Sequence, residues 1–520
     1  MNNRFNIKVL SFVLAMLMIA SVLFSCGDLD ANPSQNTERP SKPSSTILTP
    51  DHPCYDKGHT DEDSQEESGY GLCDVCSSDV IETIDFYNFN DLHGKFEDSN
   101  SNPGVDEITS YLEDRFYLDD HVVLLSSGDM WQGGSASNST KGKIITDWMN
   151  YLGFEAMALG NHEFDWGSGA VRENAAVADF SILGINIYDN ETGERVDYCK
   201  ASVMIERGGV KIGIIGAIGN CHSSIAKDKN KDFNFKTGKE LTELVEAESN
   251  KLRSEGADVI VYLIHSDDED YDIYLSAEGL VDVVFEGHTH QEYATTDAYG
   301  VPHVQDGGDN SNAMSHVELD VNFANGDVVV TQARYIKHSE CSSYASSPVV
   351  GDLVDKYWDD ISWIYDTLGY NASKRNSTTI GNKVAELYFN AATELWGDDY
   401  EIVLAGGQIN TRNPNYLNKG NISYSDLQMI LPFDNALYLC TIKGSDLKTK
   451  FIDNTSNYRI YINPDFDTSK IQNNKTYYIV ADSWTALYDW AACTTVELYD
   501  GNTFARDFLA EFIKSGGWSK

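Results

Sequence analysis

Short hydrophobic runs alternate with amphipathic segments along the chain from residue 81 onward. The clearest runs cover residues 84–89, 122–125, 156–159, 258–264 and 281–285. Residues 239–252, which lie between two of these runs, place apolar side chains at the spacing of one helix face. Buried strands that alternate with helices are typical of α/β proteins, so the pattern predicts an α/β sheet.

Polar residues that can bind a metal follow each of these hydrophobic runs. They are Asp91, His93, Asp129, Asn161, His162, His265, His288 and His290. In α/β proteins, ligands bind beyond the carboxyl ends of the strands. We therefore expect these side chains to converge at one edge, although about 200 residues of sequence separate the first from the last.

The residue types at the strand ends favour a pair of divalent cations. Carboxylate, amide and imidazole ligands suit Zn, Mn, Fe or Co. Without His162, the remaining seven residues are too many ligands for one catalytic ion but fit two ions about 3.5–4 Å apart that share a carboxylate. Such a pair clamps the oxygens of a displacement at phosphorus and generates hydroxide at neutral pH. His162 would remain to donate to a phosphoryl or leaving-group oxygen, with Asp165 orienting its ring.

We expect a second, smaller domain after the last of these strands. Residues 344–369 contain Pro348 and then apolar positions at helical spacing, which predicts a linker helix between two domains. Another helix is expected after Gly381 and Asn382. We place the first domain at 81–343 and the second at 370–520.

The first 25 residues have the features of a secretory signal peptide. Arg4 and Lys8 give the N-terminal region a positive charge, and residues 9–24 form an apolar run. An uncleaved N-terminal anchor helix is the alternative interpretation. Either way, the pattern predicts that the body of the protein lies outside the cytoplasm.

Cys26 follows the apolar run in a stretch that resembles a bacterial lipobox, in which the Cys becomes the lipidated first residue. Residues 26–53 are rich in Ser, Pro and Asn, a composition that cannot bury a core and predicts a disordered tether. The hypothesis is a secreted lipoprotein on the extracytoplasmic face of a bacterial cell membrane, in contact with that membrane through its lipid alone.

A cysteine-rich acidic segment occupies residues 54–80. Its three cysteines and one histidine have a spacing that could hold a structural zinc ion tetrahedrally. These residues are Cys54, His59, Cys73 and Cys76. A local disulfide in an oxidising compartment explains the cysteines equally well, so both alternatives remain open.

The charge of the chain excludes one class of partner. Lys and Arg total 38 and Asp and Glu total 81, which gives a formal net charge of −43. A field this negative repels phosphate backbones, so we expect no nucleic-acid polymer as a partner. A small anionic substrate is still compatible, because bound cations reverse the field locally.

The strand-end motifs, taken in order, resemble the calcineurin-like metallophosphoesterase superfamily. The motifs are Asn90-Asp91-Leu92-His93-Gly94, Gly128-Asp129, Gly160-Asn161-His162-Glu163, His265 and Gly287-His288-Thr289-His290. The run from Gly160 to Asp165 is similar to the form found in the 5′-nucleotidase family. The resemblance implies a metallophosphoesterase β-sandwich flanked by helices, followed by a smaller α/β substrate-binding domain.

The resemblance also implies roles for the strand-end residues. One ion would be held by Asp91, His93, Asp129 and His290. The other ion would be held by Asp129, Asn161, His265 and His288. His162 and Asp165 would form the catalytic dyad.

In the 5′-nucleotidase family the C-terminal domain provides two aromatic rings that sandwich a nucleobase, and Phe433 and Trp484 match those positions. The family arginine that meets the substrate is missing, because Asn410 stands in its place and Arg412 comes two residues late. Arg375 is a candidate for a remote cation. The metal ligands of the family are therefore present, whereas its substrate contacts are altered.

The leading hypothesis is a dimetal phosphohydrolase that converts nucleoside 5′-monophosphates to nucleoside and phosphate. A 2′,3′-cyclic nucleotide phosphodiesterase and a phosphoesterase for non-nucleotide esters are enzymatic alternatives. A surface lipoprotein that binds a ligand without turnover is an alternative of another class.

Overall fold

The computed structural model describes most of the chain after residue 80. The described residues are 81–96, 104–118, 121–227, 229–266, 271–308, 312–323, 325–409, 411, 415–453, 458–489 and 493–520. The predicted signal peptide, Cys26, the tether and the cluster of Cys54, His59, Cys73 and Cys76 lie outside them.

The N-terminal domain is built on two six-stranded sheets. The first contains, in spatial order, β14 (Asp327–Lys337), β13 (Asn312–Asn322), β1 (Ile81–Phe89), β2 (Val122–Ser126), β3 (Ala156–Ala158) and β4 (Ser181–Leu183). The second contains β11 (Glu292–Thr296), β12 (Pro302–Asp306), β10 (Val283–Glu286), β9 (Val259–His265), β7 (Val210–Ile218) and β6 (Ser202–Arg207). Strands β1 to β4 run parallel, and so do β7, β9, β10 and β12.

The two sheets pack face to face around a shared core. In β1, Ile84 and Phe86 point into this core, whereas Tyr87 and Phe89 point to the opposite face. This alternation follows from the two-residue period of a strand. Since both faces are covered, every position from Phe86 to Phe89 is buried, including the polar Asn88, whose side-chain amide donates to Oγ of Ser127.

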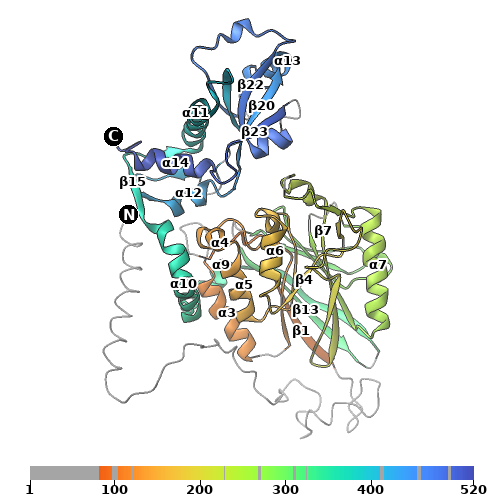
Figure 1. Ribbon diagram of the computed structural model, residues 1–520. Coiled ribbons are helices and arrows are strands. Elements are labelled where there is room, and N and C mark those ends of the chain that lie inside the picture. The colour runs from red at the N-terminus through yellow and green to blue at the C-terminus, as the bar shows by residue number, and fades with distance from the viewer. Residues whose placement is uncertain are drawn as a thin grey trace, which may run out of the picture. The chain divides into compact units, whose positions relative to one another are not determined.

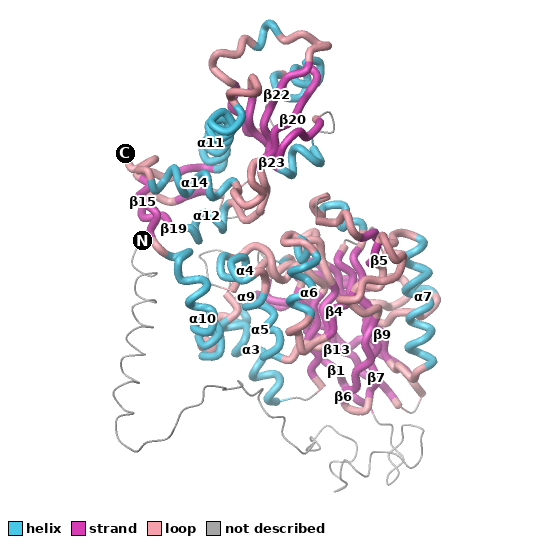
Figure 2. The backbone as a smooth tube through the Cα atoms, viewed as in Figure 1, coloured by secondary structure: helices cyan, strands magenta, loops and turns pink. Residues whose placement is uncertain are grey.

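Helices cover the outer faces of the sandwich (Figure 1 and Figure 2). The first sheet packs against α3 (Asp106–Leu118) and α5 (Lys143–Leu152), and the second packs against α7 (Lys239–Ser254). Shorter elements of this domain are α4 (Ser135–Thr140), α6 (Ser168–Ala175), α8 (Tyr274–Ala277), α9 (His338–Cys341), β5 (Ile187–Asp189) and β8 (Phe233–Phe235). The helix predicted at 239–252 is confirmed by α7.

The C-terminal domain has a smaller, five-stranded sheet. Its spatial order is β21 (Arg459–Ile462), β17 (Ile402–Gly407), β22 (Thr476–Asp482), β20 (Leu437–Lys443) and β23 (Thr494–Leu498). One face packs against α11 (Ser377–Trp396) and α14 (Ala505–Lys514). Shorter elements are β15 (Thr367–Asn371), β16 (Arg375–Asn376), β18 (Tyr416–Leu417), β19 (Gly420–Ser423), α12 (Tyr424–Ile430) and α13 (Gly444–Asp446). The predicted fold class, a helix-flanked β-sandwich plus a smaller α/β domain, is therefore confirmed.

The segment predicted as a linker helix is only partly helical. Helix α10 covers Pro348–Ile361, with its proline in the first turn, where the missing N–H costs nothing. A 3₁₀ turn follows, and β15 begins at Thr367. The helix predicted after Gly381 was placed too late, because α11 begins at Ser377. Glycine at position 381, inside this helix, leaves room for the side chain of Arg459, because a Cβ there would lie 2.6 Å from Cγ of Arg459.

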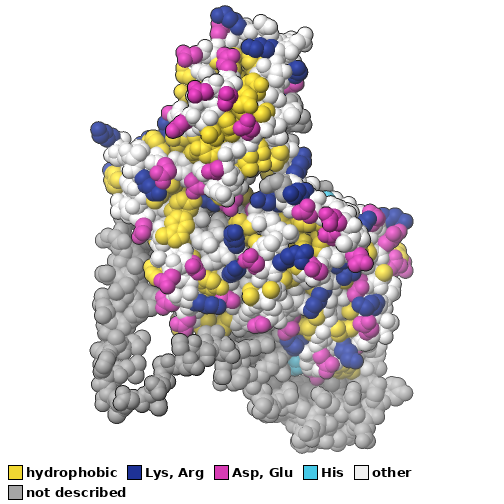
Figure 3. All heavy atoms as spheres, viewed as in Figure 1, with side chains coloured by type: hydrophobic (Ala, Val, Ile, Leu, Met, Phe, Trp, Pro, Cys, Tyr) yellow, Lys and Arg dark blue, Asp and Glu magenta, His cyan; other side chains and the backbone are white. Residues whose placement is uncertain are grey.

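The surface of the described residues carries both signs of charge. Acidic and basic side chains are interspersed over the face seen in Figure 3. Among the described helices, we find none that is long and apolar enough to cross a membrane.

Candidate metal centre

The predicted metal ligands come from five strand ends that lie at the same edge of the sandwich. Predicted ligands, in one case together with His162 of the predicted dyad, form three groups whose possible ligand atoms all lie within 4.8 Å of one another. The groups are Asp91–His93–His290, Asp91–Asp129–His265 and His93–Asp129–His162. Because Asp91 and Asp129 each belong to two groups, the groups form one continuous cluster.

Short contacts join carboxylates and imidazoles across the cluster. Nε2 of His290 lies 3.3 Å from Oδ1 of Asp91, and Nε2 of His265 lies 3.1 Å from Oδ2 of Asp129. Nε2 of His93 lies 3.1 Å from Nε2 of His290. Two ring nitrogens at this distance need a proton or a cation to bridge their lone pairs, so the arrangement favours a bound cation.

Backbone carbonyls fix the orientation of two of the histidine rings. Nδ1 of His93 lies 2.9 Å from the carbonyl oxygen of Gln132, and Nδ1 of His265 lies 2.7 Å from that of Ser127. Each Nδ1 therefore carries a hydrogen, which leaves Nε2 as the atom that faces the cluster. Hydrogen bonding of this kind on the far nitrogen is the usual support of a metal-binding histidine.

Three buried polar atoms of the cluster have no hydrogen-bond partner among the described residues other than the side chain of another predicted ligand. They are Oδ1 of Asp91, Oδ1 of Asn161 and Nε2 of His265. All three residues are at most 1% exposed. Burying such an atom without a partner costs about 1–3 kcal/mol, which coordination to a cation would remove. The residues therefore fit the divalent ions that the sequence predicts.

The backbone of the cluster is strained in a way that aims side chains inward. Only seven non-glycine residues of the described chain have positive φ angles, and five are predicted ligands. These five are Asp91, His93, Asp129, His288 and His290. Left-handed conformations of such residues cost free energy and concentrate at functional sites. The strain thus marks the same residues as the sequence does.

Close packing of the ligand loops depends on glycine. A Cβ at Gly160 would lie 2.2 Å from Oδ1 of Asp129. A Cβ at Gly128, whose φ is +98°, would lie 2.8 Å from Nδ1 of His265. Any side chain at either position would therefore push a predicted ligand out of place.

The electrostatic field of the cluster attracts cations. Although burial opposes ionisation, the hydrogen bond to His290 lowers the pKa of Asp91 to about 2. Burial also disfavours the charged form of His265, but the carboxylate of Asp129 raises the pKa of His265 to about 9. The carboxylates of Asp91 and Asp129, both of which keep a lowered pKa, would equally attract a divalent cation.

Glu163 supports the cluster in a role that the sequence did not reveal. Its Oε2 accepts hydrogen bonds from the backbone N–H groups of Asp129 and Gly160, at 2.9 and 2.8 Å. Its Oε1 accepts from the N–H groups of Met130 and Trp131, at 2.9 and 3.3 Å. This fully buried carboxylate therefore ties two ligand loops together.

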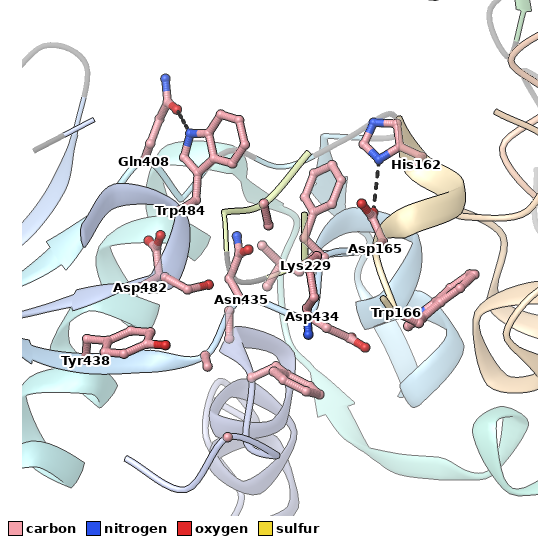
Figure 4. A pocket seen from close by; sticks show the side chains of 18 of the residues that line it. His162, Asp165, Trp166, Lys229, Gln408, Asp434, Asn435, Tyr438, Asp482 and Trp484 are labelled. Atoms are coloured by element: carbon pink, nitrogen blue, oxygen red, sulfur yellow. Dashed lines mark hydrogen bonds and ion pairs between the residues drawn. The ribbon is translucent and has the colours of Figure 1, made fainter. Parts of the chain in front are cut away.

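The predicted dyad lies beside the cluster and faces a cavity. Nδ1 of His162 lies 2.9 Å from Oδ2 of Asp165, as Figure 4 shows, and the backbone N–H of His162 donates to Oδ1 of Asp129 at 2.8 Å. His162 and Asp165 line a cavity of about 700 Å³ together with Asn161 and His288. The dyad thus connects two predicted metal ligands to the space where a substrate would bind.

Two predicted aromatic residues also line this cavity. The ring of Phe433 stacks on that of His162, with centroids 5.6 Å apart and planes at 24°. Nε1 of Trp484 donates to Oε1 of Gln408 at 2.9 Å, which fixes the indole (Figure 4). A buried arginine supports the Phe433 loop, because Nη1 of Arg506 donates to the carbonyl oxygens of Pro432 and Phe433.

Arg375, another predicted substrate contact, does not line the cavity. Arg375 donates from Nε to Oδ1 of Asn371 at 3.2 Å and lies over the ring of Trp518, so it is not among the lining residues. Asn410 and Arg412 lie outside the described residues. The cations that do line the cavity are Lys141 and Lys229, which the sequence did not single out.

Comparison with known proteins gives two family matches. Residues 84–292 match the family model of calcineurin-like phosphoesterases. Residues 364–465 match the model of the 5′-nucleotidase C-terminal domain. The first match spans all the predicted metal ligands, and the second includes Phe433.

Individual relatives agree with these matches. A 5′-nucleotidase from Diplobatis ommata is 25% identical over 413 residues, which cover 71% of this chain and 70% of that protein. An apyrase from Tabanus yao is 27% identical over 365 residues, which cover 64% of each protein. The crystal structure of a putative 5′-nucleotidase from Staphylococcus aureus, in complex with alpha-ketoglutarate, has the same fold, with a TM-score of 0.65 and 16% identity over 84% of this chain and 98% of that one.

Proposed function

Because the chain belongs to the 5′-nucleotidase family of calcineurin-like phosphoesterases, which are metal-dependent hydrolases, we propose that it converts nucleoside 5′-monophosphates to nucleoside and inorganic phosphate. One observation carries this proposal. A single cavity is lined by two metal-ligand candidates, by the His162–Asp165 dyad and by the side chains of Phe433 and Trp484. A phosphate at one end and a base at the other would use both sets of residues.

Two divalent cations are proposed to occupy the cluster. As the family resemblance implies, Asp91, His93, Asp129 and His290 would hold one of them, and Asp129, Asn161, His265 and His288 the other. When bound, the cations would polarise the phosphoryl oxygens and lower the pKa of a coordinated water. The choice of these ions among Zn, Mn, Co and Fe follows from the oxygen and imidazole donors.

His162 would act on the leaving group. Asp165 holds Nδ1 of the ring, so Nε2 is the atom that can exchange a proton with the substrate. The carboxylate stabilises the imidazolium form, which can donate a proton to the departing 5′-oxygen of the nucleoside. The oxygen of a water molecule would form the new bond to phosphorus as the bond to the 5′-oxygen breaks, the 5′-oxygen would take the proton from His162, and the products would be the neutral nucleoside and inorganic phosphate.

Phe433 and Trp484 would hold the nucleobase between their rings. Stacking of one base on an aromatic side chain contributes about 1–3 kcal/mol and accepts any base. Gln408 keeps the indole of Trp484 in one orientation, so less conformational entropy would be lost on binding.

Phosphate release from AMP tests the proposed function. Purified protein loaded with Mn, Co or Zn should release phosphate from AMP, and faster than from p-nitrophenyl phosphate at equal low concentration. Metal-loaded protein that releases no phosphate from any ester in a broad panel would favour a binding protein instead. Release from non-nucleotide esters alone would replace nucleotides as the substrate class.

Lys141 and Lys229 favour nucleoside diphosphates as a second candidate substrate. Both lysines line the cavity, and one relative of the chain is an apyrase. A terminal phosphate could bind to their ammonium groups. Replacing both with Ala should then lower kcat/KM for ADP more than for AMP, and an equal effect on the two would remove this candidate.

We also propose that the mature protein is an extracytoplasmic lipoprotein attached through Cys26. The basic start, apolar run and Cys of the N-terminal sequence support this location. Cys26→Ser should move the protein from the membrane fraction to a soluble fraction. If the variant remained in the membrane, the uncleaved anchor helix would be the better explanation.

A further inference from the structure

Cys221 lies at the same sheet edge as the predicted metal ligands. It belongs to the 3₁₀ helix Asn220–Ser224, which directly follows strand β7. Strand β7 runs parallel to β9, and Ile218 near the end of β7 pairs with His265. The parallel pairing therefore delivers Cys221 to the carboxyl end of the strand that supplies a predicted ligand.

The side chain of Cys221 is close to two of these ligands. Its Sγ and a ring nitrogen from each of His265 and His288 all lie within 4.8 Å of one another. Sγ also donates to the carbonyl oxygen of His265 at 2.8 Å. Cys221 is only 6% exposed, so its thiol faces the protein interior.

A second observation shows that this group of atoms is suited to a cation. Nε2 of His265 is fully buried and lies 3.1 Å from Oδ2 of Asp129, a carboxylate predicted to bind the same ion. The other ring nitrogen of His265 is already used by the carbonyl oxygen of Ser127. A ring nitrogen of His265, a ring nitrogen of His288 and the Cys221 sulfur thus form a mixed set of nitrogen and sulfur donors.

We propose that Cys221 is an additional ligand of the ion held by His265 and His288, and that its sulfur makes this position prefer thiophilic cations. Soft sulfur ligands favour Zn over Mn, whereas oxygen ligands suit Mn. A sulfur–metal bond forms while the thiol proton passes to solvent, and no oxidation or reduction is involved. The inference rests on the metal centre of the proposed function.

Cobalt binding provides a direct readout of a sulfur ligand. Wild-type protein freed of metal and then loaded with Co²⁺ should show visible bands from the bound ion and a near-ultraviolet sulfur-to-cobalt charge-transfer band. Cys221→Ser and Cys221→Ala should lose the near-ultraviolet band. Serine can still donate to the carbonyl oxygen of His265, so loss of the band in that variant is due to the sulfur.

Cys199 offers a matched control. It is likewise buried, at 8% exposed, and its Sγ donates to the carbonyl oxygen of Gly184 at 3.4 Å, but it belongs to none of the metal-binding groups. Cys199→Ser should keep the charge-transfer band. A band that disappears in the Cys199 variant and persists in the Cys221 variants would contradict the assignment.

Competition between metals gives a readout that does not depend on activity. With equal Zn²⁺ and Mn²⁺ present, wild-type protein should retain Zn, and Cys221→Ser should shift the Zn to Mn ratio by about tenfold or more. Wild-type protein with visible cobalt bands but no charge-transfer band would overturn the role of Cys221 and leave the proposed function intact. Protein that binds no cobalt at all would overturn both.

Discussion

Replacing Glu163 with Gln tests how the ligand loops are held together. Each oxygen of the Glu163 carboxylate accepts from two backbone N–H groups, one oxygen from Asp129 and Gly160 and the other from Met130 and Trp131. Whichever way the new amide turns, its NH₂ group faces two N–H donors. Burial raises the pKa of Glu163 to about 7, so the comparison is made above pH 8, where the carboxylate is charged. Two hydrogen bonds to a charged acceptor are then lost, and at about 1.5–3 kcal/mol each this destabilises the fold by roughly 3–6 kcal/mol.

Urea denaturation and metal titration measure the two consequences. The unfolding midpoint should fall, and metal affinity should drop about 10- to 100-fold, because the loops that carry Asp129 and Asn161 are no longer fixed. Glu173→Gln is a suitable control, since the carboxylate of Glu173 forms an ion pair with Lys143 at the surface. If Glu163→Gln changed stability by less than about 0.5 kcal/mol, the carboxylate would not be the support that its hydrogen bonds indicate.

Three further substitutions test the dyad, the base contacts and the packing of the loops. His162→Ala should lower kcat about 10²- to 10⁴-fold with bound metal unchanged, and loss of metal would contradict its role as a proton donor. Phe433→Ala or Trp484→Ala should raise KM for AMP roughly 5- to 150-fold but not KM for p-nitrophenyl phosphate; equal effects would remove the base contact. Gly160→Ala should abolish metal binding, because its Cβ would clash with Asp129, and a fully loaded variant would show that the loop can move.

The strand-end residues could be predicted because each follows a buried strand that is recognisable from its hydrophobic run. Parallel pairing then brings Asp91, Asp129 and Asn161 to one edge, whatever their separation in sequence. The left-handed backbone at Asp91 and His288 was not predictable, since only the packed loops enforce it. The role of Glu163 was hidden for a related reason, because its partners are backbone groups that carry no sequence signal.

Substrate contacts were harder to predict because side chains from distant segments determine them. In the sequence, Arg375 was a candidate for a cation that binds the substrate. In the structure, its guanidinium donates a hydrogen bond to Asn371 and lies over the ring of Trp518. The loop of Phe433 depends on Arg506, which lies 73 residues further along the chain. No local pattern in the sequence could reveal that pairing.

The bound metal of the purified protein tests the central claim most directly. We expect metal-free protein incubated with Mn²⁺ to bind two ions per chain and to give the exchange-coupled electron paramagnetic resonance spectrum of a bridged pair, whereas Asp129→Asn should lose the coupling. One ion per chain, or two ions without magnetic coupling in the wild type, would contradict a pair of cations bridged by the Asp129 carboxylate.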